Sequence, residues 1–353
     1  MLPAHLQALE PQCPRCLQQG QAHPVALARV DLADADRVLQ GALGCPACGM
    51  EYPILDGIPI LLPSLRDWVR GSLLHLVQRR DLSPALDSLI GDACGPGSAY
   101  DETRKTLATY AWDHWGHLLS TPDPHCPPGS LAALLDTLLD HAPEPADGPL
   151  LDLGCGPGAS ALRLSERFEE RLVVGVDMNF SLLSLGARLL RGQEAEIPRR
   201  GQGLVTWWER AQLPNAQDQV ALWCCDVRAL PFRGQSFGGV SSLNLLDSVD
   251  PPLQHLQELS RVLAIGGSAW MASPFDWASR ATPYEQWLGG HSQRAPHQGD
   301  SRSVLIGLMD RGVIPLEPTW EGQGPWTLRN SASSQTRYQC WLGVLSRRDE
   351  TAR

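Results

Sequence analysis

The sequence predicts an α/β protein whose larger part is a doubly wound parallel sheet, preceded by a small cysteine-rich domain. Three observations support this fold class: short apolar runs alternate with helical segments from residue 149 onward, a glycine-rich loop follows the first run, and two Cys-x-x-Cys pairs lie near the N-terminus. Such alternation is typical of parallel strands joined by crossover helices. We expect three zones, at residues 1–64, 65–145 and 146–353.

Composition excludes several classes of protein. The chain has 353 residues, 43% of them hydrophobic, which is enough for more than one domain with a buried core. Its formal net charge of -10 disfavours a general nucleic-acid-binding surface. No secretory signal and no membrane-spanning stretch is visible, so the ten cysteines indicate thiols or metal ligands in a reducing compartment. We therefore predict a cytoplasmic protein.

The first zone is organised around four cysteines. Cys13 and Cys16 form one pair and Cys45 and Cys48 the other, and Gly49 follows the second pair. Two turn-borne pairs supply the four thiolates that Zn²⁺ binds as a tetrahedron, so we predict a structural zinc site. The alternative is that these are redox or bystander thiols. The stretch between the pairs is long, and we expect an inserted loop there.

A strand, a turn at Asp56-Gly57 and a second strand are predicted after the second cysteine pair. With this tail, the first zone resembles the zinc-ribbon activator subunits of tRNA and rRNA methyltransferases, and the ribbon fused to rRNA guanine-N1 methyltransferases. Those relatives act on RNA. Here three basic residues stand against six acidic ones, and four thiolates add negative charge, so this ribbon is a poor partner for phosphate.

The middle zone is predicted to be helical in pieces. Gly95-Pro96-Gly97 and the proline-rich run at residues 122–128 interrupt it. An amphipathic helix is expected after the second interruption, because five leucines recur there at helical spacing. These are Leu131, Leu134, Leu135, Leu138 and Leu139.

The third zone contains the predicted sheet. Five strands are expected, followed by a closing antiparallel hairpin at residues 313–320 and 338–345, and a helix is expected to begin near Ala159. Cys155 and Cys224 fall in apolar runs and are predicted to be small core residues. The five strands are residues 150–153, 172–177, 221–225, 238–243 and 268–272.

A glycine loop follows the first of these strands. Gly154, Gly156 and Gly158 let the backbone turn sharply and approach a ligand at a helix N-terminus. Asp177 ends the next strand, where a carboxylate can accept two ribose hydroxyls. Asp226, followed by Val227, ends the third strand, where a carboxylate can take an adenine amino group. Asp152 lies within the first strand and is expected to be available to a ligand's ammonium.

A dinucleotide-binding enzyme is the rival interpretation of this loop. Such enzymes use Gly-x-Gly-x-x-Gly, and here the third glycine falls one position early. The pattern instead resembles class I S-adenosylmethionine-dependent methyltransferases over residues 149–353. That resemblance implies a Rossmann-like seven-stranded sheet and S-adenosylmethionine as cofactor. The positions that match are Asp152, Gly154, Gly156, Gly158, Asp177, Met178, Asp226, Val227 and Asn244.

Two further motifs belong to the predicted carboxyl edge of the sheet, where ligands bind in open α/β folds. Asn244-Leu-Leu-Asp247 follows the fourth strand. A loop rich in aromatic residues follows the fifth, with Trp277, Tyr284 and Trp287 before a Gly-Gly pair. Such a loop can cover a small flat acceptor, although packing is the favoured role for each tryptophan taken alone.

These motifs resemble the C-terminal methyltransferase domain of ovothiol-synthesis enzymes, which N-methylates the imidazole of a thiolated histidine. The likeness spans about 170 residues and includes Ser-Pro-Phe-Asp-Trp277 and Thr-Pro-x-x-x-Trp-Leu-Gly-Gly290. Ser248 stands where that family has Arg, and Arg329-Asn-Ser where it has Arg-Glu-Thr. The family's iron-dependent domain is absent, with the cysteine-rich zone in its place.

The resemblance implies an N-methyltransferase acting on an imidazole, in a histidine derivative or a histidine-containing peptide. A neutral imidazole has a pKa of about 6.5 and already carries a free lone pair at pH 7, so the enzyme mainly positions it. Asp247 is predicted to fix the other ring N–H, and Asn244 to orient the acceptor or the cofactor. Tyr284 is expected to wall the site and to act in catalysis, with Trp115, Trp277 and Trp287 as further substrate contacts.

Two other functions stay open. One is an rRNA or tRNA base methyltransferase that uses the ribbon to recognise RNA. The other is a non-catalytic scaffold that binds S-adenosylmethionine and activates a partner. On the preferred hypothesis the partner is a small molecule or peptide substrate, with no nucleic acid and no membrane, and a homodimer is the assembly to test.

Overall fold

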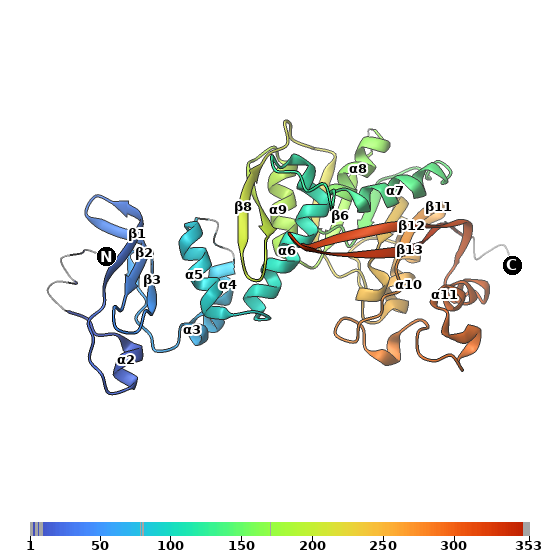
Figure 1. Cartoon of the computed structure of the whole chain (residues 1–353). Coiled ribbons are helices and arrows are strands. Elements are labelled where there is room, and N and C mark those ends of the chain that lie inside the picture. Colours follow the sequence, from blue (N-terminus) through green and yellow to red (C-terminus); the bar gives the residue numbers. More distant parts are fainter. Residues whose placement is uncertain are drawn as a thin grey trace. The chain divides into compact units, whose positions relative to one another are not determined.

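The computed structural model describes residues 3, 6, 10–77, 79, 81–169 and 171–348 (Figure 1). It divides into two compact units. Unit 1 comprises Met1–Ala108, Pro198–Trp208 and Ser331–Ser333, and unit 2 comprises the remaining segments. The three zones expected from the sequence stay a prediction, and their outer ends at residues 1 and 353 lie outside the described residues.

Unit 1 begins with an antiparallel sheet in the order β1-β2-β3-β4. The predicted strand, turn and strand after the second cysteine pair are confirmed: Asp56 (φ 52°) and Gly57 (φ 78°) form the turn between β3 and β4. The loop expected between the cysteine pairs is instead the β1–β2 hairpin, so that prediction was wrong. The strands are β1 (Ala26–Asp34), β2 (Arg37–Gly44), β3 (Glu51–Leu55) and β4 (Ile58–Pro59).

Short helices complete unit 1. Ser83 caps α5, where its hydroxyl accepts the Leu86 N–H at 3.1 Å. One apolar core contains strand residues such as Leu43 and helix residues such as Ile90, so the ribbon and the helices bury their side chains together. The helices are α2 (Pro14–Gln18), α3 (Leu65–Gly71), α4 (Leu73–Val77), α5 (Pro84–Cys94) and α6 (Ala99–Trp115), of which the residues after Ala108 belong to unit 2.

A buried polar network joins α5, the first part of α6 and the segment Pro198–Trp208 within unit 1. The Asp87 carboxylate accepts hydrogen bonds from the Tyr100 hydroxyl at 3.0 Å and from the Trp208 indole N–H at 3.2 Å, and it pairs with Arg104. Buried charges are stable only when they are paired in this way. These contacts explain why a segment distant in sequence belongs to this unit.

Unit 2 contains the predicted seven-stranded sheet, in the order β12-β13-β11-β10-β5-β6-β9. The five strands from β11 to β9 run parallel, and β13 pairs antiparallel to β11. All five predicted strands and the closing hairpin are confirmed. The bounds are β5 (Leu150–Leu153), β6 (Val173–Asp177), β9 (Val220–Cys224), β10 (Phe237–Leu243), β11 (Leu263–Ser273), β12 (Leu316–Ser331) and β13 (Ser334–Arg347).

Helices cover both faces of this sheet, as its two apolar cores show. Leu150 packs with the predicted leucine helix α7 and with α8, whereas its neighbour Leu151 packs with α10 and α11. Successive strand residues point to opposite faces, so the sheet is buried on both sides. The helices are α7 (Ser130–Asp140), α8 (Ala159–Arg167), α9 (Phe180–Leu190), α10 (Pro252–Val262) and α11 (Ser301–Asp310), with 3₁₀ turns η1 (Gly116–Leu118), η2 (Leu246–Ser248), η3 (Tyr284–Gln286) and η4 (Pro296–Gly299).

Two sequence predictions about cysteines have opposite outcomes. Cys155 is buried, as expected. Cys224 is exposed, because β9 is the last strand of the sheet and its final residues lack a covering neighbour. A separate two-stranded sheet of β7 (Ala195–Arg200) and β8 (Thr206–Ala211) precedes β9. Within the described residues, no helix combines the length and the apolar character needed to cross a bilayer.

The strand order places the ligand-binding edge. After β5 the chain continues to β6 on one side, while β10 joins β5 on the other side. At such a switch point the loops leaving neighbouring strands diverge and open a crevice at their carboxyl ends. The segments that follow β5, β6, β9, β10 and β11 therefore meet at this edge.

Candidate functional site

The four predicted metal ligands lie together in unit 1. Their sulfur atoms all fall within 4.8 Å of one another, with Cys13 Sγ 3.7 Å from Cys48 Sγ and Cys16 Sγ 3.9 Å from Cys45 Sγ. A tetrahedral Zn²⁺ with bonds of about 2.3 Å places its sulfurs about 3.8 Å apart. The cluster therefore has the dimensions of a Cys₄ zinc site and is compatible with a zinc ribbon.

Local contacts explain how the cysteines reach this arrangement. Gly49 adopts φ 69° and its N–H donates to the Cys45 carbonyl at 2.9 Å, which closes the second knuckle. The fully buried Tyr52 places its hydroxyl 3.2 Å from Cys13 Sγ and accepts the Arg15 N–H at 3.2 Å. A hydroxyl directed at a thiolate in this way orients the ligand and offsets its charge.

The glycine loop begins where β5 ends, at the carboxyl edge of the sheet in unit 2. Gly154, Gly156 and Gly158 have φ values of 71°, 52° and 87°, which residues other than glycine rarely adopt. A Cβ on Gly154 would lie 2.9 Å from the side chain of Leu245. The loop then leads into α8, a nine-residue helix, so it lies at a helix N-terminus.

Asp177 ends β6 beside this loop. Its two oxygens accept the Gly156 N–H at 2.9 Å and the Asn179 N–H at 2.7 Å, which fixes the carboxylate against the loop. Burial raises the pKa of Asp177 above its ordinary value. The next residue, Met178, is 64% exposed and presents an apolar surface there. The predicted roles of Asp177 at the ribose and of Met178 at the cofactor stay predictions.

Asp226 follows β9, and Val227 behind it is buried. The Arg228 guanidinium forms an ion pair with Asp226 at 2.7 Å, and its hydrogen bonds to the carboxylate lower the pKa of Asp226. Asp226 is therefore ionised and held in place. An adenine amino group, which Asp226 is expected to accept, would share its carboxylate with Arg228.

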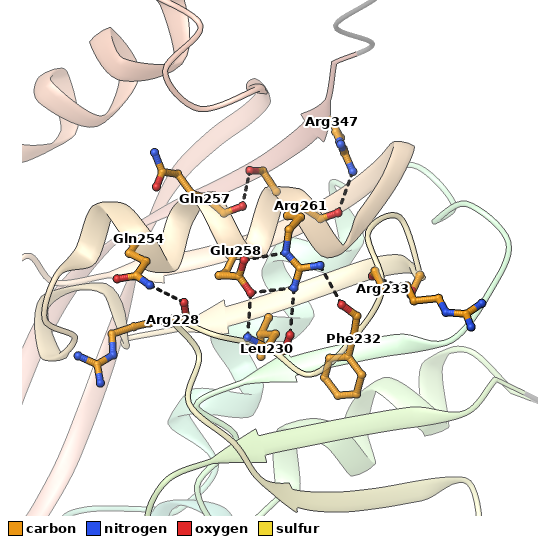
Figure 2. Close-up of polar contacts among 11 residues, drawn as sticks. Arg228, Leu230, Phe232, Arg233, Gln254, Gln257, Glu258, Arg261 and Arg347 are labelled. Carbon is orange, nitrogen blue, oxygen red and sulfur yellow. Dashed lines mark hydrogen bonds and ion pairs between the residues drawn. The ribbon is translucent and has the colours of Figure 1, made fainter.

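A glutamate and an arginine on α10 hold the segment that follows Arg228 (Figure 2). Glu258 accepts the Leu230 N–H at 2.8 Å, and Arg261 donates to the carbonyls of Leu230 and Phe232 at 3.0 and 2.8 Å. The two side chains also pair with each other at 2.6 Å. This network fixes the loop that carries Asp226.

Asp152 does not lie where the sequence suggested. We expected it to face a ligand's ammonium, but it is 1% exposed and accepts hydrogen bonds from the hydroxyls of Ser160 and Ser241, each at 2.6 Å. Burial raises its pKa to about 6. In this structure its two hydrogen bonds tie α8 and β10 to β5.

Asn244 ends β10 in a left-handed conformation with φ 52°, and its N–H donates to the Ala272 carbonyl at 2.8 Å. Both polar atoms of its side chain are buried and have no hydrogen-bond partner within the described part of the chain. A buried amide in this state is costly unless a ligand satisfies it. Together with the glycine loop and Asp177, it fits the requirement of a class I methyltransferase for S-adenosylmethionine.

Asp247 follows on the 3₁₀ turn η2 and is 4% exposed. Its Oδ2 accepts the backbone N–H of Asp276 at 2.8 Å, and burial raises its pKa to about 6. Thr282 donates its hydroxyl to the Asp247 and Val249 carbonyls. The segment after β11 is thus fastened to the segment after β10, and a carboxylate that is ionised at pH 7 lies at their junction.

The predicted aromatic wall forms a cluster in the loop after β11. Trp287 lies 5.1 Å from Tyr284 and 6.2 Å from Trp277, measured between ring centroids, and His291 stacks edge-on against Tyr284 at 4.8 Å. The indole N–H of Trp287 donates to the Thr282 carbonyl at 2.8 Å. Since the Thr282 hydroxyl also donates to the Asp247 backbone carbonyl, this contact connects the cluster to the backbone of η2.

The hydroxyl of Tyr284 donates to the His291 carbonyl at 3.1 Å, although the side chain is 47% exposed. It is therefore engaged within its own loop, and a role in the chemical step requires that this bond be exchanged for one to substrate. The Trp277 indole donates to Ser301 at 2.9 Å, which anchors the cluster to α11.

Trp115 has a different place from the one expected. We predicted a substrate contact, but its ring has no exposed surface and its indole N–H donates to the Pro157 carbonyl of the glycine loop at 2.8 Å. His114 beside it accepts the Ala159 N–H at 3.2 Å, and burial lowers its pKa to about 3, so the ring is neutral. The end of α6 supports the loop from behind.

Sequence reasoning missed three residues around Asp247. Tyr110 lies one helical turn before His114, so both face the glycine loop. Burial raises the pKa of Tyr110, with further contributions from the charges of Asp177 and Asp247. Burial raises the pKa of Tyr338 on β13 as well, and the charges of Asp276 and Asp247 add to that rise. The spacing of Tyr110 and His114 was a usable signal; Tyr338 and Asp276 meet only through the sheet order.

Comparison with known proteins identifies the domain that carries this edge. Residues 151–271 match the family model described as "Methyltransferase domain". Residues 151–271 are a methyltransferase domain. The prediction of a methyltransferase domain with a Rossmann-like sheet is thereby confirmed.

Curated relatives include trans-aconitate 2-methyltransferases. The protein from Variovorax paradoxus is 28% identical over 159 residues, which cover 44% of this chain and 58% of the relative. The protein from Rhodopseudomonas palustris is 32% identical over 125 residues, covering 33% and 45%. The chain thus spans about half the length of the curated relatives it matches.

Solved structures similar to this chain include a SAM-dependent methyltransferase from Methanosarcina mazei. It has a TM-score of 0.40 and 18% identity and covers 61% of this chain and 98% of the solved one. Geranyl diphosphate C-methyltransferase from Streptomyces coelicolor has a TM-score of 0.40 and 20% identity, with coverage of 61% and 76%.

Proposed function

We propose that this chain is an S-adenosylmethionine-dependent N-methyltransferase whose acceptor is an imidazole, in a histidine derivative or a histidine-containing peptide. The observation that carries the proposal is Asp247, a buried carboxylate with a pKa of about 6 at the carboxyl edge of a methyltransferase sheet. It lies three residues from Asn244, whose buried amide has unsatisfied polar atoms.

The cofactor site uses residues that the edge brings together. The glycine loop would contact the methionine part, Asp177 the ribose hydroxyls, and Met178, Asp226 and Val227 the adenine. When bound, S-adenosylmethionine supplies an electrophilic methyl group on a sulfonium. The protein's task is then to place a nucleophilic lone pair in line with that methyl group.

Asp247 performs this positioning for an imidazole. Its ionised carboxylate accepts the N–H of one ring nitrogen, so that the lone pair of the other nitrogen faces the methyl group. No strong base is needed, because the neutral ring already carries that lone pair. The methylated ring is a cation, and the Asp247 carboxylate and the aromatic faces of Tyr284 and Trp287 stabilise that charge as it develops.

A carboxylate acceptor is the second candidate, because several relatives are named trans-aconitate 2-methyltransferases. A tricarboxylate requires cationic side chains around it. Here Asp247 and Asp276 adjoin each other instead, and the charge of Asp276 raises the pKa of Asp247. Arg280 is the cation whose charge also acts on Tyr110 at this edge, and the two adjoining carboxylates favour an acceptor that donates N–H groups.

The four cysteines are proposed to bind one structural Zn²⁺. Their arrangement supports a folding role, with every sulfur directed at the others and Tyr52 directed at Cys13. An RNA acceptor, the other function left open by the sequence, has the acidic balance of the ribbon against it. The cytoplasmic location and the homodimer remain predictions.

The experiment that tests the proposal is methyl transfer from S-adenosylmethionine to imidazole acceptors, with Asp247→Asn as the decisive variant. We expect methylhistidine-type products from the purified chain. The variant should lose about 100-fold in kcat, as expected for a lost positioning contact, and should bind S-adenosylhomocysteine as wild type does. Methylation of trans-aconitate or RNA in place of imidazoles would refute the proposal.

A further inference from the structure

A polar hollow of about 330 Å³ lies in unit 1, next to the two cysteine knuckles at residues 13–16 and 45–49. Its volume falls within the range of small-ligand pockets, about 300–1,000 Å³. It is lined from both knuckles, from the start of α3 and from the end of α5. The lining side chains that can bind a ligand are two arginines, two glutamines and a methionine: Arg15, Arg66, Gln18, Gln19 and Met50.

The cysteine knuckles hold two of these residues in place. Arg15 lies within the first knuckle, and its backbone N–H donates to the Tyr52 hydroxyl at 3.2 Å. Met50 follows the second knuckle, and its carbonyl accepts the Cys45 N–H at 2.9 Å. The geometry of the cysteine cluster therefore sets the geometry of one side of the hollow.

The second guanidinium is placed by α3 and α5. Ser64 caps α3, where its hydroxyl accepts the Asp67 N–H at 3.3 Å. Gly95, which follows α5, leaves the space that the Arg66 side chain occupies, because a Cβ there would lie 3.0 Å from Arg66 Nη2. Two arginines that are distant in sequence thus line one hollow.

The charges of these arginines are not neutralised by the described part of unit 1. No ion pair or hydrogen bond involves the guanidinium of Arg15 or of Arg66 among the residues that the structure describes. Asp67, although it adjoins Arg66 in sequence, lies 3.7 Å from Arg70 instead. Two guanidinium groups in one hollow attract an anion, and their planar N–H groups match the two oxygens of a carboxylate.

Apolar surface accompanies this charge. Met50 lines the hollow, and Leu17 and Leu62, each a sequence neighbour of a lining residue, are 51% and 41% exposed. A peptide that carries a carboxylate between apolar side chains uses both kinds of surface. RNA is disfavoured, because no aromatic residue lines the hollow and residues 1–64 carry six acidic against three basic side chains.

We propose that this hollow is a docking site for an acidic peptide segment of a partner protein. Arg15 and Arg66 bind the carboxylate, and Leu17 and Leu62 pack against its apolar neighbours. The partner is then a protein with an exposed aspartate or glutamate flanked by apolar residues. This inference goes beyond the proposed methyl transfer and does not depend on it, since every residue that carries it belongs to unit 1.

The test is an NMR titration of the full chain, in the presence of Zn²⁺, with the acetylated tripeptide amides Leu-Glu-Leu and Leu-Gln-Leu, which differ in one charge. The side-chain Nε–H signals of Arg15 and Arg66 should shift, and Leu-Glu-Leu should bind about tenfold more tightly, as expected for one charge-assisted hydrogen bond. Arg66→Gln should remove this preference. Arg37→Gln, at an exposed site on β2 of the same unit, should retain it.

Equal binding of the two peptides, no shift of either arginine signal, or an unchanged preference in Arg66→Gln would overturn the inference. Inorganic phosphate is the third probe, and tighter binding of phosphate than of Leu-Glu-Leu at the same signals would replace the peptide by a phosphate ligand such as RNA. Arg15→Gln should also lose the preference. Its zinc content is measured alongside, and if the metal is lost, Arg66→Gln, which lies outside the knuckles, decides.

Discussion

The cysteine cluster of unit 1 and the carboxyl edge of unit 2 are built by different means. Four cysteines in two short motifs form the first, and their sulfurs meet mainly one another. The second gathers residues from Tyr110 to Tyr338, and it contains a buried amide that no described residue satisfies. On the proposals above, a metal ion completes the first site and organic ligands complete the second.

The sharpest test of this difference is removal of one cysteine. Cys45→Ser should reduce bound zinc from about one ion per chain to almost none, and unit 1 should lose its protection against proteolysis, because a structural zinc site contributes about 10 kcal/mol. Metal analysis and limited proteolysis measure both effects. Cys94→Ser, at a buried cysteine outside the cluster, is the matched control. Full zinc content in Cys45→Ser would show that the cluster is a set of bystander thiols.

A large effect is also expected at low pH, and it belongs to the carboxyl edge alone. Asp247, with a pKa of about 6, must be ionised to accept the ring N–H, and an imidazole acceptor must be neutral. Both requirements fail as the pH falls, so log kcat/KM should drop with a slope approaching about 2 below pH 6. In Asp247→Asn the slope should be about 1. A slope of 1 in wild type would remove Asp247 from the mechanism.

The α10 network tests whether the edge depends on distant support. Glu258→Ala leaves the Leu230 N–H unsatisfied and frees Arg261, which should cost about 1–3 kcal/mol of stability. The loop that carries Asp226 should then bind S-adenosylhomocysteine about tenfold more weakly, measured by calorimetry. Glu166→Ala breaks a surface pair with Arg163 and should change neither quantity. Unchanged affinity in Glu258→Ala would mean that the loop is positioned without this glutamate.

The smallest effect is expected from Tyr110→Phe. The ring is retained and only the hydroxyl near Asp177 and Asp247 is lost, so kcat should fall about fivefold to tenfold, as for one neutral hydrogen bond. Zinc content should stay unchanged, since Tyr110 belongs to unit 2. Steady-state kinetics with a fixed acceptor measures this loss. A larger loss in cofactor affinity than in kcat would place the hydroxyl on the cofactor instead.

The two regions also differ in how much of them sequence could predict. The cysteine spacing specified the ligands of unit 1, and strand alternation specified the seven-stranded sheet with its glycine loop. The sequence analysis expected Asp152 and Trp115 to contact ligands, because a motif gives only position along the chain, whereas burial follows from packing. In the structure the Ser160 and Ser241 hydroxyls bond Asp152, and the Pro157 carbonyl accepts the Trp115 indole N–H. Tyr338 and Asp276 meet because β13 lies beside β11, and no spacing in the sequence encodes that.

The network around Asp87 has a consequence for dividing this chain. Unit 1 is not continuous in sequence, since Arg200 and Trp208 come from a segment inserted between α9 and β9. A shortened chain that starts at Thr109 would keep both residues but lose their partners, so Arg200 would lack its 2.7 Å ion pair with Asp101 and the Trp208 indole would lack the Asp87 carboxylate. A genetic fusion or truncation that treats the ribbon as a detachable module would therefore yield two damaged fragments, and point substitutions are the sound way to separate their roles.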